Sequence, residues 1–197
     1  MRKTVTVSVL YPPGEPEILG YDEDRILKAG DKLKLDCKTR GGNPLAQLVW
    51  YRNDEKLDHS YTTVGGKYSI NTLEFTVDSR DNNAVYRCEA NSPVMDKRNS
   101  VKQVKLAVHY APTKLIIDSI KDAKAGDVVP VTCRTEPSNP AANISWVVDG
   151  RSFASANNSV VPAPGGGFIT TSNISISITN QVSLLFFFIS LSLFLSH

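Results

Sequence analysis

A repeat dominates the sequence. Residues 28–31 (Lys-Ala-Gly-Asp) recur as residues 124–127, and the same offset of 96 carries Cys37 onto Cys133 and Trp50 onto Trp146. A second alignment, at an offset of 99, links the alternating residues of 5–13 to those of 104–112. A fixed offset through rare residues is typical of a chain built from copies of one unit. The sequence therefore predicts the last strand of a preceding copy in residues 1–11, a complete copy in 12–110, and the N-terminal part of a further copy in 111–181.

Apolar and polar residues alternate within the complete copy. Leu33, Leu35 and Cys37 form one such run, and residues 73–77 form another. A period of two is typical of β-strands with one buried face. Turn-forming segments rich in Gly, Asn, Asp and Pro separate the runs. We therefore expect an all-β fold of short strands, either a sandwich or a barrel.

Cys37, Trp50, Tyr86 and Cys88 stand in an order and spacing that resemble the immunoglobulin superfamily. The resemblance covers nearly the whole chain and implies tandem sandwiches of the C2 or I type, with the last one truncated. It also implies a disulfide between Cys37 and Cys88, Trp50 packed on that bond, and the Tyr86 hydroxyl bound to the backbone of the neighbouring loop. A disulfide closing so long a loop stabilises a domain by roughly 4 kcal/mol. Trp146 is the core tryptophan expected in the next copy.

Three segments carry a closer resemblance: residues 11–16 (Tyr-Pro-Pro-Gly-Glu-Pro), 40–50 (Arg-Gly-Gly-Asn-Pro-Leu-Ala-Gln-Leu-Val-Trp) and 138–140 (Ser-Asn-Pro). They are similar to interior modules of the nephrin family, with Hibris and Sticks-and-stones. The resemblance implies a fragment of an adhesion protein on the extracellular side of the plasma membrane, with its membrane association through the parental protein. Its modules would be spacers or cis/trans contact units, and its partners other immunoglobulin-superfamily surface proteins, homophilic or of the Kirre type.

Two other classes of protein stay open. One is the ectodomain of a signalling receptor for a soluble ligand. The other is an intracellular structural array, in which the cysteines would be reduced and no sugar attached.

The further copy lacks a second cysteine. An offset of 96 carries Cys88 onto Leu184, and the offset of 101 given by the preceding strand carries it onto Ile189, so we expect Cys133 to be unpaired. Residues 182–197 form an apolar tail unlike the earlier copies, which we expect to lie outside the fold. The tail is interpreted first as read-through past an exon boundary. A membrane anchor is less favoured because a spanning helix needs about 20 residues, and a lipid-anchor signal is the least favoured.

Three Asn-X-Ser sequons occur in the further copy, at Asn143, Asn157 and Asn173, and are candidate N-glycosylation sites. The N-terminus alternates from Thr4 to Val9, where a signal peptide would be continuously apolar. We therefore expect this fragment to lack a signal peptide of its own. The junction at residues 108–113 contains a proline and no Gly/Ser tract, which favours a semi-rigid connection between copies.

The remaining residue patterns favour no catalytic, cofactor or metal site. The three histidines, His59, His109 and His197, are scattered, and the acidic run 22–24 lacks the spaced ligands of a calcium loop. A net charge of +2 provides no electrostatic footprint for nucleic acid. We expect a binding protein that is not an enzyme.

Overall fold

A computed structural model describes residues 3–95, 100–119, 122–148, 150–153, 156–179 and 187–192, with the backbone alone at 151 and 187–192. These ranges are almost entirely β, and none of them holds a helix long and apolar enough to cross a membrane. The elements are β1 (Glu17–Leu19), β2 (Ile26–Lys28), β3 (Lys32–Arg40), β4 (Gln47–Arg52), β5 (Glu55–Asp58), β6 (Thr62–Val64), β7 (Tyr68–Thr76), the 3-10 helix η1 (Ser79–Asp81), β8 (Val85–Asn91), β9 (Ser100–Lys105), β10 (Ala107–His109), β11 (Leu115–Ser119), β12 (Val128–Thr135), β13 (Asn143–Val148), β14 (Arg151–Phe153), β15 (Asn157–Pro162), β16 (Phe168–Ser177) and β17 (Phe187–Ser192).

The chain divides into two compact units, an N-terminal module up to Val108 and a C-terminal module from His109 onward. The predicted boundary follows residue 110, two residues later than the observed one, and two tyrosines explain the difference. Tyr110 exchanges backbone hydrogen bonds of 2.8 and 3.0 Å with Asn139, and Tyr11 makes the same bridge to Asn43. Each tyrosine therefore belongs to the module that follows it. Residues 3–10, predicted as a strand of a preceding copy, form no strand.

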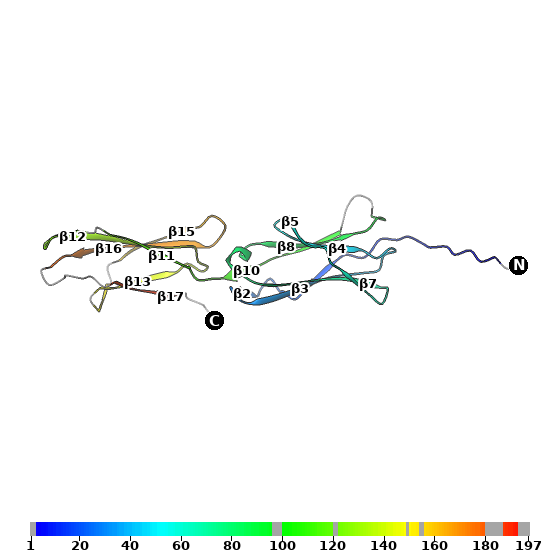
Figure 1. Cartoon of the computed structure of the whole chain (residues 1–197), viewed down its shortest axis with the longest axis horizontal. Helices are drawn as coiled ribbons and strands as arrows, with labels where there is room; N and C mark the ends of the chain where they lie inside the picture. Colours follow the sequence, from blue (N-terminus) through cyan, green and yellow to red (C-terminus); the bar gives the residue numbers. More distant parts are fainter. Residues whose placement is uncertain are drawn as a thin grey trace. The chain divides into compact units, whose positions relative to one another are not determined.

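The N-terminal module is a two-layer sandwich. One sheet has the strand order β1-β3-β7-β6, the other β5-β4-β8-β9, and β2 pairs with β10 beside them. The two layers face each other, with β4 and β8 on one side and β3 and β7 on the other (Figure 1). β3 shows why the sequence forms this layer, because Leu33, Leu35 and Cys37 are buried while the residues between them are not.

The centre of this sandwich holds the predicted disulfide between Cys37 and Cys88, whose Cα atoms lie 6.2 Å apart. Trp50 is fully buried in the same cluster, and its Nε1 donates to the Asn71 carbonyl at 3.1 Å. Asn71 in turn donates to the Leu48 carbonyl at 3.0 Å. The indole thus packs in an apolar core without leaving its donor unpaired.

The C-terminal module repeats this plan, with β11-β12-β16-β15 in one layer and β14-β13-β17 in the other. Figure 1 shows β12 and β16 in one layer and β13 and β17 in the other. Its core contains Cys133 and Trp146, together with Val129, Val131, Ile144, Ile174 and Ile176. Trp146 Nε1 donates to the Ser172 hydroxyl at 2.7 Å. Ser172 stands where Asn71 stands in the first module, at the offset of 101 found for this strand.

The prediction that the apolar tail lies outside the fold is wrong for Phe187–Ser192. This segment forms β17, which pairs antiparallel with β13 and places Ile189 opposite Trp146. Cys88 stands opposite Trp50 in the first module, so Ile189 occupies the position of the second cysteine. A strand pairs through its backbone and requires no cysteine, and alternating apolar residues have a high β propensity. The rest of residues 182–197 lies outside the described residues.

Candidate contact surface

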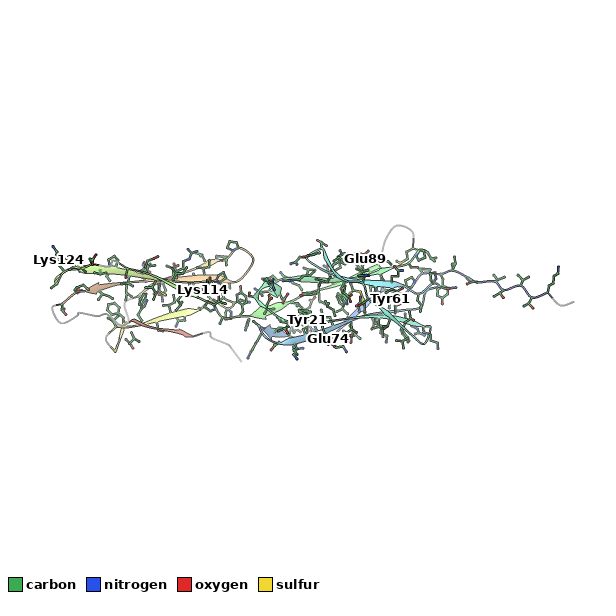
Figure 2. All side chains as sticks on the ribbon, viewed as in Figure 1. Tyr21, Tyr61, Glu74, Glu89, Lys114 and Lys124 are labelled. Atoms are coloured by element: carbon green, nitrogen blue, oxygen red, sulfur yellow. A yellow bond between two sulfur atoms is a disulfide. The ribbon has the colours of Figure 1, made fainter. Side chains whose placement is uncertain are left out.

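Arg87 lies near the middle of the outer face of the β5-β4-β8-β9 sheet. β8 alternates strictly: Tyr86, Cys88 and Ala90 are buried, and Arg87 and Glu89 point away from the core. Arg87 is in register with Tyr51 on β4 and with Gln103 on β9, so strands flank it on both sides. Figure 2 shows Glu89 on this sheet and Glu74 on the opposite one.

Three neighbours hold the Arg87 guanidinium. Its Cζ lies 4.2 Å from the centroid of the Tyr51 ring. It donates to Glu89 at 2.7 Å and to Asp54 at 3.3 Å. We call Tyr51, Asp54, Arg87 and Glu89 the Arg87 cluster. Stacking on a ring and pairing with carboxylates are the two interactions for which the planar guanidinium is best suited.

Asp54 reaches Arg87 because of a tight turn between β4 and β5. Asn53 and Asp54 both have positive φ, 46° and 69°, as a two-residue type I′ hairpin turn requires. Asn and Asp are among the residues that tolerate this conformation. The Asn53 side chain also accepts a hydrogen bond of 2.9 Å from the Val85 N–H, which fixes the turn against the start of β8.

The side chains of the Arg87 cluster differ in how far they are exposed to solvent. The side chain of Asp54 is 90% exposed, whereas those of Arg87 and Glu89 are 23% and 14% exposed. Half of the Val101 surface is exposed on β9, opposite Glu89 in register. Tyr and Arg are enriched at protein interfaces, where they provide most of the binding energy. Tyr51 and Arg87 are therefore the candidate contact residues of this surface.

Tyr86 differs from its sequence prediction. Its hydroxyl donates at 2.8 Å to the Asp81 carboxylate, not to a backbone atom. The same carboxylate pairs with Arg52 at 3.1 Å and accepts a hydrogen bond from the Asp78 N–H. Burial and the bond to Asp81 raise the pKa of the Tyr86 hydroxyl well above its usual range. These contacts join η1 to β8 and β4, and they stabilise the fold.

The remaining predicted residues take distinct places. Cys133 is a buried free cysteine, and burial raises the pKa of its thiol. Asn157 and Asn173 are exposed, and Asn143 is half-buried. His59 is exposed in a loop, and His109 ends β10; His197 lies outside the described residues.

The acidic run 22–24 is a turn in which the Asp24 N–H donates to the Asp22 side chain. Among the residues with described side chains, no three His, Cys, Asp or Glu residues gather as metal ligands would.

The Arg87 cluster was not found by sequence reasoning. The alternation of residues 85–91 can be read from the sequence, and it places Arg87 on the outer face of β8. Glu89 lies on the same strand, but Tyr51 comes from β4 and Asp54 from the turn that follows it, so these two partners follow only from the strand register.

Comparisons with known proteins agree with this architecture. Residues 15–92 match an immunoglobulin domain family, and residues 116–185 match the CD80-like C2-set immunoglobulin domain family. The chain is therefore a tandem of two immunoglobulin-like domains and belongs to the immunoglobulin superfamily.

Its curated relatives are adhesion-type members of that superfamily. Human nephrin is 30% identical over 89% of this chain, and rat cell adhesion molecule 2 is 27% identical over 79% of it. The chain spans only 14% of the length of nephrin and 37% of that of cell adhesion molecule 2.

Two solved structures share the fold. The mouse nectin-like molecule 4 ectodomain is 27% identical, with a TM-score of 0.50 over 83% of this chain and 55% of that one. Rst D1-D2 is 19% identical, with a TM-score of 0.56 over 93% and 94% of the two chains.

Proposed function

We propose that this chain is part of the extracellular region of a cell-surface adhesion protein and that its N-terminal module binds other immunoglobulin-type surface proteins. The similarity to nephrin and to cell adhesion molecule 2 supports the class. The disulfide between Cys37 and Cys88 supports an oxidising, extracellular environment. The proposed location is the outer side of the plasma membrane, through the parental protein.

The Arg87 cluster carries the proposal. It is an outward-facing group of an aromatic ring, a guanidinium and two carboxylates on a rigid sheet. Because both signs of charge are present, two copies of the surface can pair Arg87 of one with Asp54 of the other. An isologous contact requires such self-complementarity. A second copy of this chain is therefore the first partner to test, and a different immunoglobulin-type protein is the second.

Bead clustering tests this function. Beads that display the whole chain at high density should cluster, and Arg87→Glu should abolish the clustering, because the reversed charge would face Asp54 and Glu89. Lys34→Glu is the matched control, since Lys34 is an exposed cation on the opposite sheet. It should leave clustering unchanged.

If wild-type beads cluster neither with each other nor with beads that display nephrin-type or Kirre-type ectodomains, the contact role fails. The modules would then be spacers.

A further inference from the structure

The two modules differ sharply on one face. The outer side of β3 carries a row of charged residues, namely Lys32, Lys34, Asp36, Lys38 and Arg40. The five corresponding positions are Val128, Pro130, Thr132 and Arg134 on β12, and Glu136 just after it. On the neighbouring strand, Glu74 pairs with Lys34 in the first module, whereas β16 presents Thr171, Asn173, Ser175 and Ser177 in the second. The row on β3 thus holds five charged residues, whereas the charged residues at the corresponding positions of the second module are Arg134 and Glu136, with Asp118 on the neighbouring β11.

Two sequons meet on this face of the second module. Asn157 on β15 lies directly opposite Asn173 on β16, and both are exposed. The Cβ atoms of directly opposed residues in an antiparallel pair lie about 4.5–5.5 Å apart. Two acceptor residues 16 positions apart in the sequence are thus neighbours in the sheet.

The surroundings suit a sugar. The amide oxygen of Asn173 accepts a hydrogen bond of 2.7 Å from the Thr132 hydroxyl, and the nitrogen of that amide is the atom that carries a glycan. Both asparagines line a hollow with Pro130, Thr132 and Phe153, so apolar and hydroxyl groups lie beside the attachment points. Sugars pack on such surfaces through their C–H faces and hydroxyls.

Asn143 differs from this pair. It is half-buried at the start of β13 and lies between strands, in register with Ser192 on β17.

We propose that the outer face of the β11-β12-β16-β15 sheet is a glycan-bearing face, with N-linked oligosaccharide on the Asn157–Asn173 pair. The donor is a lipid-linked pyrophosphoryl oligosaccharide. The asparagine Nδ2 forms a bond to the anomeric carbon, and the bond from that carbon to the pyrophosphate oxygen breaks. The lipid pyrophosphate leaves with the electron pair, and the amide loses one proton.

A bulky neutral glycan replaces the solvation that charged side chains provide on the first module. It also excludes proteins from this face, so contacts are left to other surfaces such as the Arg87 cluster. The inference rests on the proposed function in one respect, because the acceptor residues must enter the secretory pathway.

Glycan mapping tests the proposal. The whole chain is expressed in cultured cells behind a cleavable secretion signal. The secreted protein is deglycosylated enzymatically in heavy-oxygen water, which labels each formerly glycosylated asparagine as aspartate for peptide mass spectrometry. We expect label at Asn157 or Asn173.

Two double variants remove the pair in different ways. Asn157→Gln with Asn173→Gln removes the acceptors, and Ser159→Ala with Ser175→Ala removes the hydroxyls of the sequons while both asparagines stay in place. Each should lose the sugar mass at this face, and Asn143→Gln, the matched control, should retain it.

Secreted protein that has the Cys37–Cys88 bond but no label at Asn157 or Asn173, or label at Asn143 alone, overturns the proposal and leaves the proposed function standing. If Asn157 or Asn173 carries the label but the protein clusters with no partner, the glycan proposal stands and the proposed contact function fails.

Discussion

The most constrained residues of the N-terminal module surround a buried charge. The Asp81 carboxylate is 4% exposed and receives Tyr86 O–H, the Asp78 N–H and the Arg52 guanidinium. A buried carboxylate is tolerated only when such partners replace its lost hydration. Tyr86 also stacks on Phe75, with the ring centroids 5.0 Å apart. One tyrosine therefore joins the apolar core to the polar base of the sandwich.

Tyr86→Phe should destabilise the module. The variant keeps the ring and removes the hydroxyl, which leaves the buried Asp81 carboxylate one partner short, at a cost of about 1.5–3 kcal/mol. Urea unfolding of the whole chain, followed by tryptophan fluorescence, measures the change. Tyr51→Phe is the control, because the half-buried ring keeps its contact with Arg87. An equal loss in both variants would contradict the role of the Asp81 bond.

Asp78 should make stability depend on pH. The Arg80 side chain, which bonds Asp78 at 2.6 Å, holds the pKa of that carboxyl below its usual value of 3.8. Because the folded pKa is the lower one, the contribution is present above the unfolded pKa and is lost as the pH falls through the folded pKa. We expect Asp78→Asn, which retains a capping side chain, to flatten this acid limb in unfolding curves measured from neutral pH downward. An unchanged limb would exclude Asp78 as its source.

At the scale of elements, β17 is the least expected part of the molecule. It pairs with β13 over six residues and takes the place that β8 has in the N-terminal module. Cys133 lies in the core of the same module and forms no disulfide. Ile117, in register with Cys133, remains 44% exposed, whereas its counterpart Ile18 packs against the first core. Ile117 is thus less buried in its module than Ile18 is in the first.

Ile189→Cys should restore the missing disulfide. Ile189 has the register position of Cys88, so the new thiol should bond with Cys133 and stabilise the module by roughly 4 kcal/mol if the geometry is unstrained. Non-reducing mass analysis and a thiol count report the bond. Phe188→Cys is the matched control, because a shift of one residue moves the side chain to the other face of the strand. Bond formation in the control alone would show that the register is wrong.

At the scale of the whole molecule, each module has its own core, and only the first core contains a disulfide. Domains with separate cores can unfold in separate transitions. The C-terminal module, with an unpaired Cys133 and partly exposed Ile117, should be the less stable of the two.

Calorimetry should therefore show two transitions, with the C-terminal module melting first. Reductant should lower the upper transition by about 15 °C or more, since the disulfide contributes roughly 4 kcal/mol. The lower transition should not move, because Cys133 has no bond to lose. A single transition that is insensitive to reductant would contradict this assignment.

The repeat and the all-β class follow from the sequence alone, because alternation and recurring spacings can be read along the chain. The sequence predicted the Cys37–Cys88 bond through its resemblance to the immunoglobulin superfamily, and the structure contains that bond. The sequence did not determine the role of residues 187–192, since strand pairing uses backbone groups that every sequence provides. Nor did it bring Arg87 to Tyr51 and Asp54, or Asn157 to Asn173. Those contacts join separate strands, and only the register between strands decides which residues meet.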